Sequence, residues 1–112
     1  MERRCRHSYN DIDDSFIISC KEENENIRER FMLDDMIFYL TGNGKIVGLQ
    51  IRNVSQLLSE SSLELDLENL ESVDLIINTR ENSLFVGLRL ISMNKEQRLP
   101  LGRVFLPQLT VK

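Results

Sequence analysis

Cys5, His7 and Cys20 are the residues of this chain whose types and spacing are best suited to chemistry. A period-two alternation around residues 5–9 and the apolar run "FIIS" predict two antiparallel strands, which would place the two thiols opposite each other. Thiolates and imidazole are zinc ligands, but structural zinc sites use four ligands and this spacing lacks a Cys-x-x-Cys pair. We therefore expect three buried side chains, with a small metal- or redox-linked site at these residues as the alternative.

The same residues could form a disulfide or a nucleophile pair. A Cys5–Cys20 disulfide fits the predicted register, but free thiols are the default in a reducing compartment. No acid is placed to orient His7, which a Cys-His nucleophile pair would favour, so we assign no catalytic residue. The predicted register pairs Tyr9 with Phe16, His7 with Ile18, and Cys5 with Cys20.

The acidic stretch "NDIDDS" places Asp11, Asp13 and Asp14 close together, a spacing that could bind Ca²⁺. An EF-hand loop also needs glycine at its sixth position, which here is Phe16. We therefore expect a solvated turn.

The glycine-rich stretch "TGNGKIVGLQI" could cradle a phosphate only if a helix followed it. An apolar strand pattern follows instead, so Asn43-Gly44 is expected to form a type I′ hairpin turn. Tyr39 would then cover Gly48 on one face of the hairpin. The expected pairs on the other face are Leu40 with Val47, Phe38 with Leu49, and Met36 with Ile51.

Charge and hydropathy limit the classes of partner. The net charge of −4 argues against a dedicated nucleic-acid surface, because phosphate binding needs clustered Lys and Arg. Arg3, Arg4 and Arg6 are the local exception, and a nucleic-acid-binding accessory role through them is a further alternative to a solvated strand face. No apolar stretch reaches the roughly 20 residues that cross a bilayer, and the N-terminus is charged from Glu2 on. We expect a cytoplasmic protein with no membrane partner.

In the middle of the chain, the spacing of the apolar residues becomes that of a helix. Val54, Leu57 and Leu58 share one side of a short helix that Asn53 or Ser55 could cap. A capping box from Ser61 to Glu64 predicts a second helical stretch through about residue 70.

Strand patterns return after residue 72. The runs "VDLIIN" and "SLFVGLRLI" predict a hairpin, and residues 103–106 predict a short last strand bounded by Pro100 and Pro107. Proline cannot donate to a strand ladder, which favours an edge position. The expected pairs are Ile77 with Leu84, Leu75 with Val86, and Val73 with Leu88.

These elements predict one α+β domain over residues 1–112. It would be mainly an antiparallel β-sheet of six to eight short strands, with one or two short helices from residues 54–70 covering one face. Sheet edges would be exposed, at "GRVFL" or at the first hairpin. We expect a homodimer through such an edge.

Residues 9–58 resemble domain-of-unknown-function family 2283, a family of small bacterial and archaeal domains. The matching segments are "YNDIDDSFIIS" and "GKIVGLQIRNVSQLL", the second of which is the more specific. Gln50 stands where the family often has an acidic residue, and residues 72–112 add a hairpin and an edge strand. The resemblance implies a β-rich unit with one helix and no established activity.

No constellation in the sequence favours catalysis or a cofactor. We therefore expect an uncharacterised non-catalytic interaction or scaffold module that is not an enzyme and that self-associates.

Overall fold

A computed structural model describes residues 2–80, 83–93 and 95–105, with the side chains of 5–79, 83–93 and 95–102. The described chain is dominated by β-strands, joined by one α-helix and one short 3₁₀ turn. Their bounds are β1 Glu2–Asn10, β2 Ser15–Ser19, β3 Glu29–Leu33, β4 Met36–Leu40, β5 Ile46–Arg52, α1 Val54–Glu60, η1 Leu67–Asn69, β6 Ser72–Arg80, β7 Ser83–Ser92 and β8 Lys95–Phe105.

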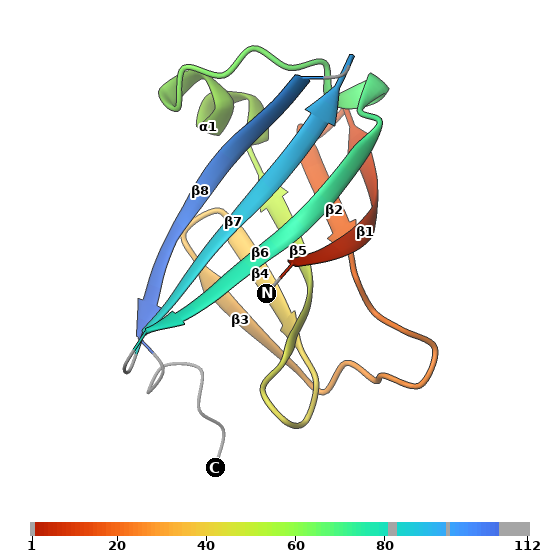
Figure 1. Cartoon of the computed structure of the whole chain (residues 1–112), viewed down its shortest axis with the longest axis vertical. Helices are drawn as coiled ribbons and strands as arrows, with labels where there is room; N and C mark the ends of the chain where they lie inside the picture. Colours follow the sequence, from red (N-terminus) through yellow and green to blue (C-terminus); the bar gives the residue numbers. More distant parts are fainter. Residues whose placement is uncertain (1, 81–82, 94, 106–112) are drawn as a thin grey trace.

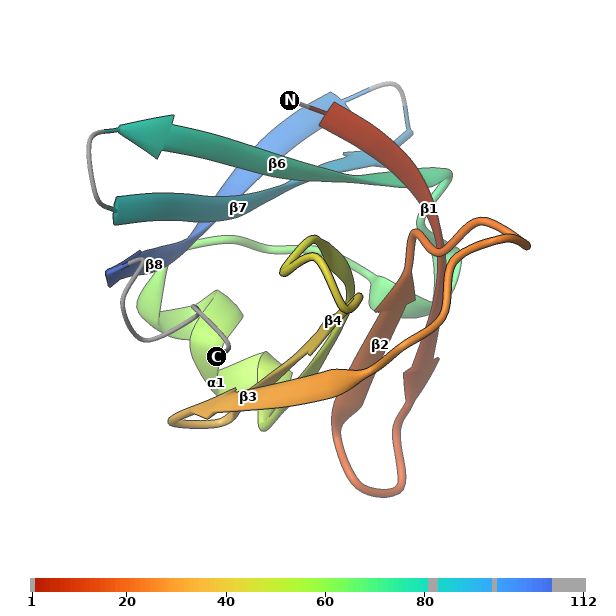
Figure 2. The same cartoon turned by 90° about the horizontal axis from the view of Figure 1, so that it is seen from below.

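All neighbouring strands pair antiparallel, in the order β3-β4-β5-β2-β1-β6-β7-β8. The sheet bends into a half-barrel, with β6–β8 in one layer and β2–β5 in the other (Figures 1 and 2). Strand β1 belongs to both layers, because residues 2–5 pair with β6 and residues 6–10 pair with β2. The expected antiparallel sheet is confirmed at eight strands, but with one α-helix the fold is closer to all-β than to α+β.

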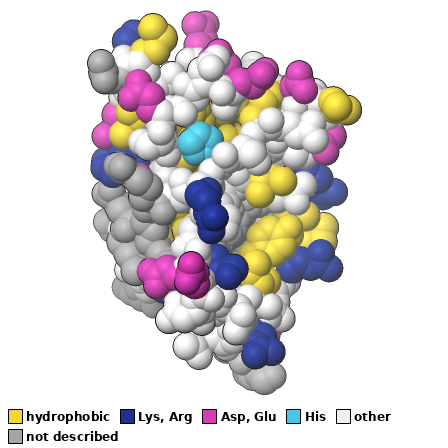
Figure 3. Space-filling model, turned by 90° about the vertical axis from the view of Figure 1, so that its right-hand side faces the viewer, with side chains coloured by type: hydrophobic (Ala, Val, Ile, Leu, Met, Phe, Trp, Pro, Cys, Tyr) yellow, Lys and Arg dark blue, Asp and Glu magenta, His cyan; other side chains and the backbone are white. Residues whose placement is uncertain are grey.

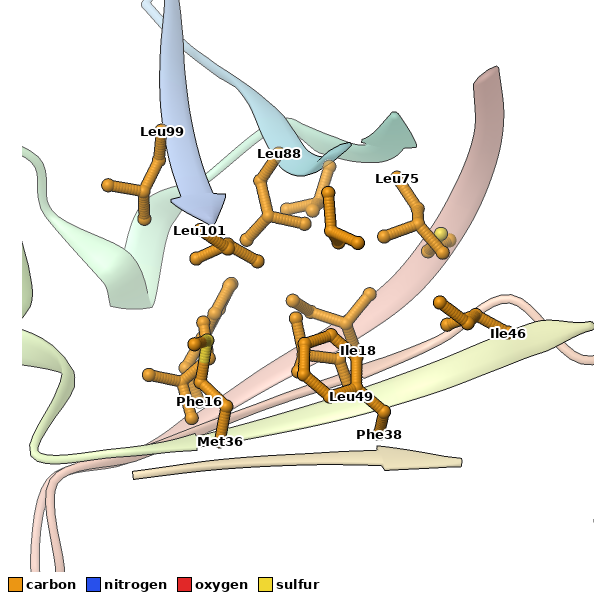
Figure 4. Close-up of a cluster of buried hydrophobic side chains, with 14 of the residues drawn as sticks. Phe16, Ile18, Met36, Phe38, Ile46, Leu49, Leu75, Leu88, Leu99 and Leu101 are labelled. Atoms are coloured by element: carbon orange, nitrogen blue, oxygen red, sulfur yellow. The ribbon is translucent and has the colours of Figure 1, made fainter. Parts of the chain in front are cut away.

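The hydrophobic core lies between the two layers. Alternate residues of each strand face inward, as in β4, where Met36, Phe38 and Leu40 are buried and the residues between them are half-buried. Figure 4 shows leucines of β6, β7 and β8 facing aromatic and aliphatic side chains of β2, β4 and β5. Burial of these apolar faces is the main stabilising term of the fold.

The first hairpin has the predicted register. Tyr9 pairs with Phe16 and His7 pairs with Ile18. A slip by one residue would have turned the apolar side chains to solvent, so the alternation excludes that register.

The Asn43-Gly44 hairpin has the predicted position but a different turn. Gly44 N donates to Thr41 O at 2.9 Å and Thr41 N donates to Lys45 O at 2.9 Å. Only Gly44, at φ 81°, has a positive φ, so this is a type I turn followed by a glycine bulge, not a type I′ turn. The predicted pair of Leu40 with Val47 is wrong, because a register shift sets Leu40 opposite Ile46. The other predicted pairs, Met36 with Ile51 and Phe38 with Leu49, are confirmed.

The β6–β7 hairpin pairs two residues away from the predicted register. Val73 lies opposite Leu90, Leu75 opposite Leu88 and Ile77 opposite Val86. A shift of two leaves every side chain on its predicted face. The prediction of which side chains face the core is therefore confirmed. The three predicted pairs, Ile77 with Leu84, Leu75 with Val86 and Val73 with Leu88, are wrong.

Helix α1 confirms the first predicted helix, with Val54 and Leu58 buried. It lies at the open side of the half-barrel, between β8 and the β3–β4 hairpin (Figure 2). The second predicted helix is wrong: Ser61 ends α1, and within residues 63–70 only the 3₁₀ turn η1 is helical. Within the described residues, no helix is long and apolar enough to cross a membrane.

The two edges of the sheet are β3 and β8. The expectation that the first hairpin forms an edge is wrong, because β1 pairs with β6 and β2 pairs with β5. The last strand is confirmed as an edge but begins at Lys95, so it is longer than predicted and contains Pro100. Residues 106 and 107 lie outside the described part of the chain.

Candidate functional site

Cys5 of β1 and Cys20, the residue directly after β2, form a disulfide with their Cα atoms 4.3 Å apart. The predicted register brings them opposite each other, but the expectation of two free thiols is wrong. Both residues are buried, at 8% and 6% exposure, and Cys20 N donates to Val47 O at 2.8 Å. A disulfide has no thiolate to offer a metal, so the bond removes two of the three proposed ligands.

His7 lies on the same face as the disulfide and is half-buried. Its ring centroid lies 6.1 Å from that of Phe16. Figure 3 shows the histidine at the surface, with hydrophobic side chains around it. The structure thus brings Cys5, His7 and Cys20 together as predicted. Across the described residues, however, no group of three His, Cys, Asp or Glu side chains could hold a metal ion.

The acidic corner of the first hairpin does not form one cluster. Asp11 and Asp13 are exposed, whereas Asp14 turns toward helix α1 with φ 55°. Asp14 Oδ1 accepts from the Tyr9 hydroxyl at 2.7 Å, and Oδ2 accepts from the Ser55 hydroxyl at 2.6 Å. The turn expected here is present, and one of its carboxylates serves to fix the helix.

This contact shifts the pKa values of two groups. The hydrogen bond to Asp14, with smaller contributions from desolvation and nearby acids, raises the pKa of Tyr9 from 10.0 to about 12. For Asp14, partial burial opposes ionisation, but hydrogen bonds from Ser55 and Tyr9 outweigh it and lower the pKa below 3.8. Both shifts follow from the local structure and need no ligand.

The structure describes the arginines of the N-terminal stretch only in part. The backbone of Arg3 and Arg4 pairs with β6, and their side chains lie outside the described part. Arg6 is exposed and points to the convex side of the β2–β5 layer.

That convex side, here called the outer face, carries an apolar patch that the sequence did not single out. The patch consists of Ile17, Met32, Ile37 and Tyr39, from β2, β3 and β4. Ile17 and Met32 are 42% and 62% exposed. Two of these residues had a sequence signal: Ile17 interrupts the polar alternation of its strand, and Tyr39 was expected over Gly48 on the face away from the core.

Among the described side chains of the outer face, those in strand-paired rows carry only positive charge, and the acidic Asp34 and Asp35 lie beyond them in the β3–β4 turn. Strand pairing aligns the side chains of this face in three rows, and their only charged members are Arg6, Arg30 and Arg52. Tyr39 covers Gly48 as predicted, and its hydroxyl lies 3.3 Å from the Gln50 side-chain oxygen. Figure 3 shows blue side chains beside a yellow patch on this side of the molecule. The rows are Arg6-Ser19-Gly48-Tyr39-Arg30, Ser8-Ile17-Gln50-Ile37-Met32 and Asn10-Ser15-Arg52.

The free edge of β3 borders this face. Arg30 and Asp34 are both exposed, and neither side chain forms a hydrogen bond or ion pair with any described residue. Asp34 lies in the tight turn to β4 and has φ 53°. The edge therefore presents one cation, one apolar side chain and one anion in the order Arg30, Met32, Asp34.

A cavity of ≈ 440 Å³ opens between helix α1, the β3–β4 turn and β8. Its floor is apolar, with Met36, Ile51 and Leu101, and Asp35 and Glu60 are among the polar residues of its rim. A cavity of this size could admit a small molecule, but no polar group buried inside it selects a ligand.

Comparisons with protein-family models, curated proteins and solved structures find no match to this chain. The resemblance to family 2283 therefore stays a prediction.

Proposed function

We propose that this protein is a non-catalytic interaction module of the cytoplasm, related to family 2283, which works by binding another polypeptide and by self-association. The observation that carries the proposal is the outer face, where an apolar patch is bordered by arginines. Met, Tyr and Arg are enriched at protein interfaces, whereas Lys and Glu are depleted there. The described side chains in the three rows of the outer face include the first three types and neither of the last two.

Exposure of this patch has a physical cost that an interface would remove. Removing apolar surface from water is favourable by roughly 25 cal/mol per Å². Met32, at 62% exposure, and Ile17, at 42%, come from strands separated by β4 and β5, so they belong to one broad surface. A broad apolar surface on a sheet fits a partner protein better than it fits a small substrate.

Self-association follows from the two edges of the sheet. An unpaired strand edge invites pairing with another chain unless it is blunted by proline, a bulge or charge. Strand β8 has Pro100, a register shift beside it, and Gly102 with φ 136°. Strand β3 has neither a proline nor a register shift, so we assign the homodimer contact to β3.

Light scattering coupled to size-exclusion chromatography tests the proposal. The mass should rise with concentration from 13.1 kDa toward twice that value. Met32→Lys should keep the protein monomeric, because a lysine on an edge strand opposes pairing. Met93→Lys, at another highly exposed methionine, should leave the dimer unchanged. A strict monomer at high micromolar concentration would contradict self-association.

A redox-linked role of Cys5, His7 and Cys20 is the second candidate, favoured by the disulfide. Cytosolic disulfides in most organisms are transient or redox-sensing. Thiol counting on protein unfolded directly from cells, with metal analysis beside it, separates the two candidates. Two free thiols with bound zinc, lost in Cys20→Ser, would support a metal site, and a thiol count that follows the redox state of the cell would support a redox role.

A further inference from the structure

We propose that two copies of this chain pair through β3 in one defined register, with Met32 on the two-fold axis and Arg30 of each copy opposite Asp34 of the other. The inference rests on the proposed self-association and specifies its contacts. Three lines of argument support it: the main-chain groups of β3 that point to the free edge, the side of the sheet to which each side chain points, and the charges of Arg30 and Asp34.

The first line is the direction of the main-chain groups. Leu33 and Met36 close the two-residue turn between β3 and β4, and the closing pair of such a hairpin exchanges its hydrogen bonds within the hairpin. Leu33 and Phe31 therefore bond toward β4. The N–H and C=O groups of Arg30 and Met32 point to the free edge, where a second strand could accept and donate.

The second line is the facing of the side chains. When an antiparallel strand extends a sheet around a two-fold axis, directly opposed residues must point to the same side. Only registers with two copies of Arg30, of Phe31 or of Met32 on the axis meet this condition near the centre of β3.

The charges and apolar groups distinguish these three registers. An axis at Arg30 sets two arginines against each other, which is unfavourable. An axis at Phe31 sets Met32 against Arg30 and Leu33 against Glu29, so apolar groups face charged ones. An axis at Met32 sets Met32 against Met32, Phe31 against Leu33, and Arg30 against Asp34.

The Met32 register therefore sets complementary groups opposite each other over the paired segment, residues 30–34, which consists of β3 residues and the first turn residue after them, Asp34. Arg30 and Asp34 are exposed in the isolated chain and form no ion pair with any described residue, so no internal contact is lost on pairing. The segment ends at Asp34, because Asp35 turns back and its carbonyl accepts from Arg52 N of β5 at 2.8 Å. The symmetry doubles each contact away from the axis and produces a closed dimer.

This pairing also joins the outer faces of the two copies. Met32 lies in the row that contains Ile37 and Ile17, and the row continues across the axis into the same residues of the second copy. The dimer thus presents one apolar surface about twice as wide as that of a single chain.

A charge-reversal cycle tests the register. Arg30→Asp and Asp34→Arg should each weaken the dimer about tenfold or more, because each change replaces two attractive contacts with two repulsive ones. The double variant, Arg30→Asp with Asp34→Arg, should recover most of the affinity. Dissociation constants from sedimentation equilibrium measure the effect, and circular dichroism checks that each variant is folded.

Arg28→Asp is the matched control. It lies just before β3 and outside the paired segment, it is exposed, and it faces no charge in the Met32 register. With the axis at Phe31 instead, Arg28 would lie opposite Asp34. Loss of the dimer in Arg28→Asp with no effect of Arg30→Asp would overturn the proposed register.

Cysteine cross-linking gives an independent readout. Opposed residues of paired strands have Cα atoms about 5 Å apart, within the range that a disulfide spans. Met32→Cys should form a covalent dimer on mild oxidation, and Met93→Cys, which is 84% exposed, should form far less.

The results separate the two proposals. A strict wild-type monomer contradicts self-association and the register with it. A wild-type dimer that neither cross-links through Met32→Cys nor responds to Arg30→Asp leaves self-association standing and overturns the register alone.

Discussion

The carboxylate of Asp14 caps helix α1 through Ser55, although the two residues lie 41 positions apart. Asp14 Oδ2 accepts from the Ser55 hydroxyl at 2.6 Å and from Ser55 N at 3.2 Å. The residue at the helix N-cap, Asn53, makes no side-chain cap bond. The corner of the first hairpin therefore replaces the local cap and fastens the helix to the sheet.

Asp14→Ala should lower the free energy of unfolding by about 1 kcal/mol, the usual cost of losing an N-cap acceptor. Asp13→Ala, in the same turn but exposed, should have an effect near zero. Urea unfolding followed by circular dichroism measures both. Equal effects of the two changes would show that Asp14 acts only as a turn residue.

Stability should fall at low pH as Asp14 takes up a proton. The pKa of Asp14 is lower in the folded protein than its ordinary value of 3.8. Its contribution is therefore present above that value and is lost as the pH falls through the folded pKa. In Asp14→Asn, the free energy of unfolding should depend less on pH in the acidic range. An unchanged pH dependence in that range would contradict the assigned hydrogen bonds.

Tyr9 should ionise about two pH units later than an ordinary tyrosine. Its pKa is raised from 10.0 to about 12, first by the hydrogen bond to Asp14. A raised pKa means that its stabilising contribution is complete below pH 10.0 and is lost as the pH rises through about 12. Ultraviolet titration of Tyr39→Phe, which leaves one tyrosine, should show this late midpoint, and adding Asp14→Asn should lower it.

Reduction of the Cys5–Cys20 disulfide should destabilise the fold by about 3 kcal/mol, the value for a loop of about 15 residues in the chain-entropy account. The double change of Cys5 and Cys20 to serine should have a comparable effect. Thermal unfolding with and without reductant measures it. If the reductant produces free thiols but leaves the midpoint unchanged, the bond is not structural.

Gly48→Ala should be clearly destabilising, whereas Gly42→Ala should be nearly neutral. A Cβ at position 48 would lie 3.3 Å from Ile18 O and 3.5 Å from Tyr39 Cδ2, but one at position 42 meets only Arg28 Cγ at 3.5 Å. The backbone carbonyl of a central strand cannot move as an exposed side chain can. Comparison of the two unfolding midpoints gives the result.

Sequence alternation predicted which side chains face the core, and pairing the two runs about the middle of the loop at residues 10–15 predicted the first register. It could not locate the β6–β7 register, since a slip of two residues preserves every face. Leu75 meets Leu88 instead of Val86, and both partners are aliphatic. Pattern alone does not distinguish them.

Local sequence motifs predicted the wrong helix boundaries where tertiary contacts compete with them. Ser61 and Glu64 have the spacing of a capping box, but Ser61 N donates to Leu57 O and Leu58 O and so ends helix α1. The capping of α1 by Asp14 had no sequence signal, because it depends on how the hairpin and helix meet. The outer face likewise became visible only when the strand order placed Met32, Ile37 and Ile17 in one row.

The membership of β1 in both layers has a consequence for the order of folding. Strands β3–β5 and β6–β8 form from neighbours in sequence, whereas Arg3 pairs with Leu75 across most of the chain. Contacts of such long separation form late and slow the folding of β proteins. We expect two meanders that form early and a slow closing step as the first strand joins them. Shortening the N-terminus would therefore delay folding far more than it would alter either meander.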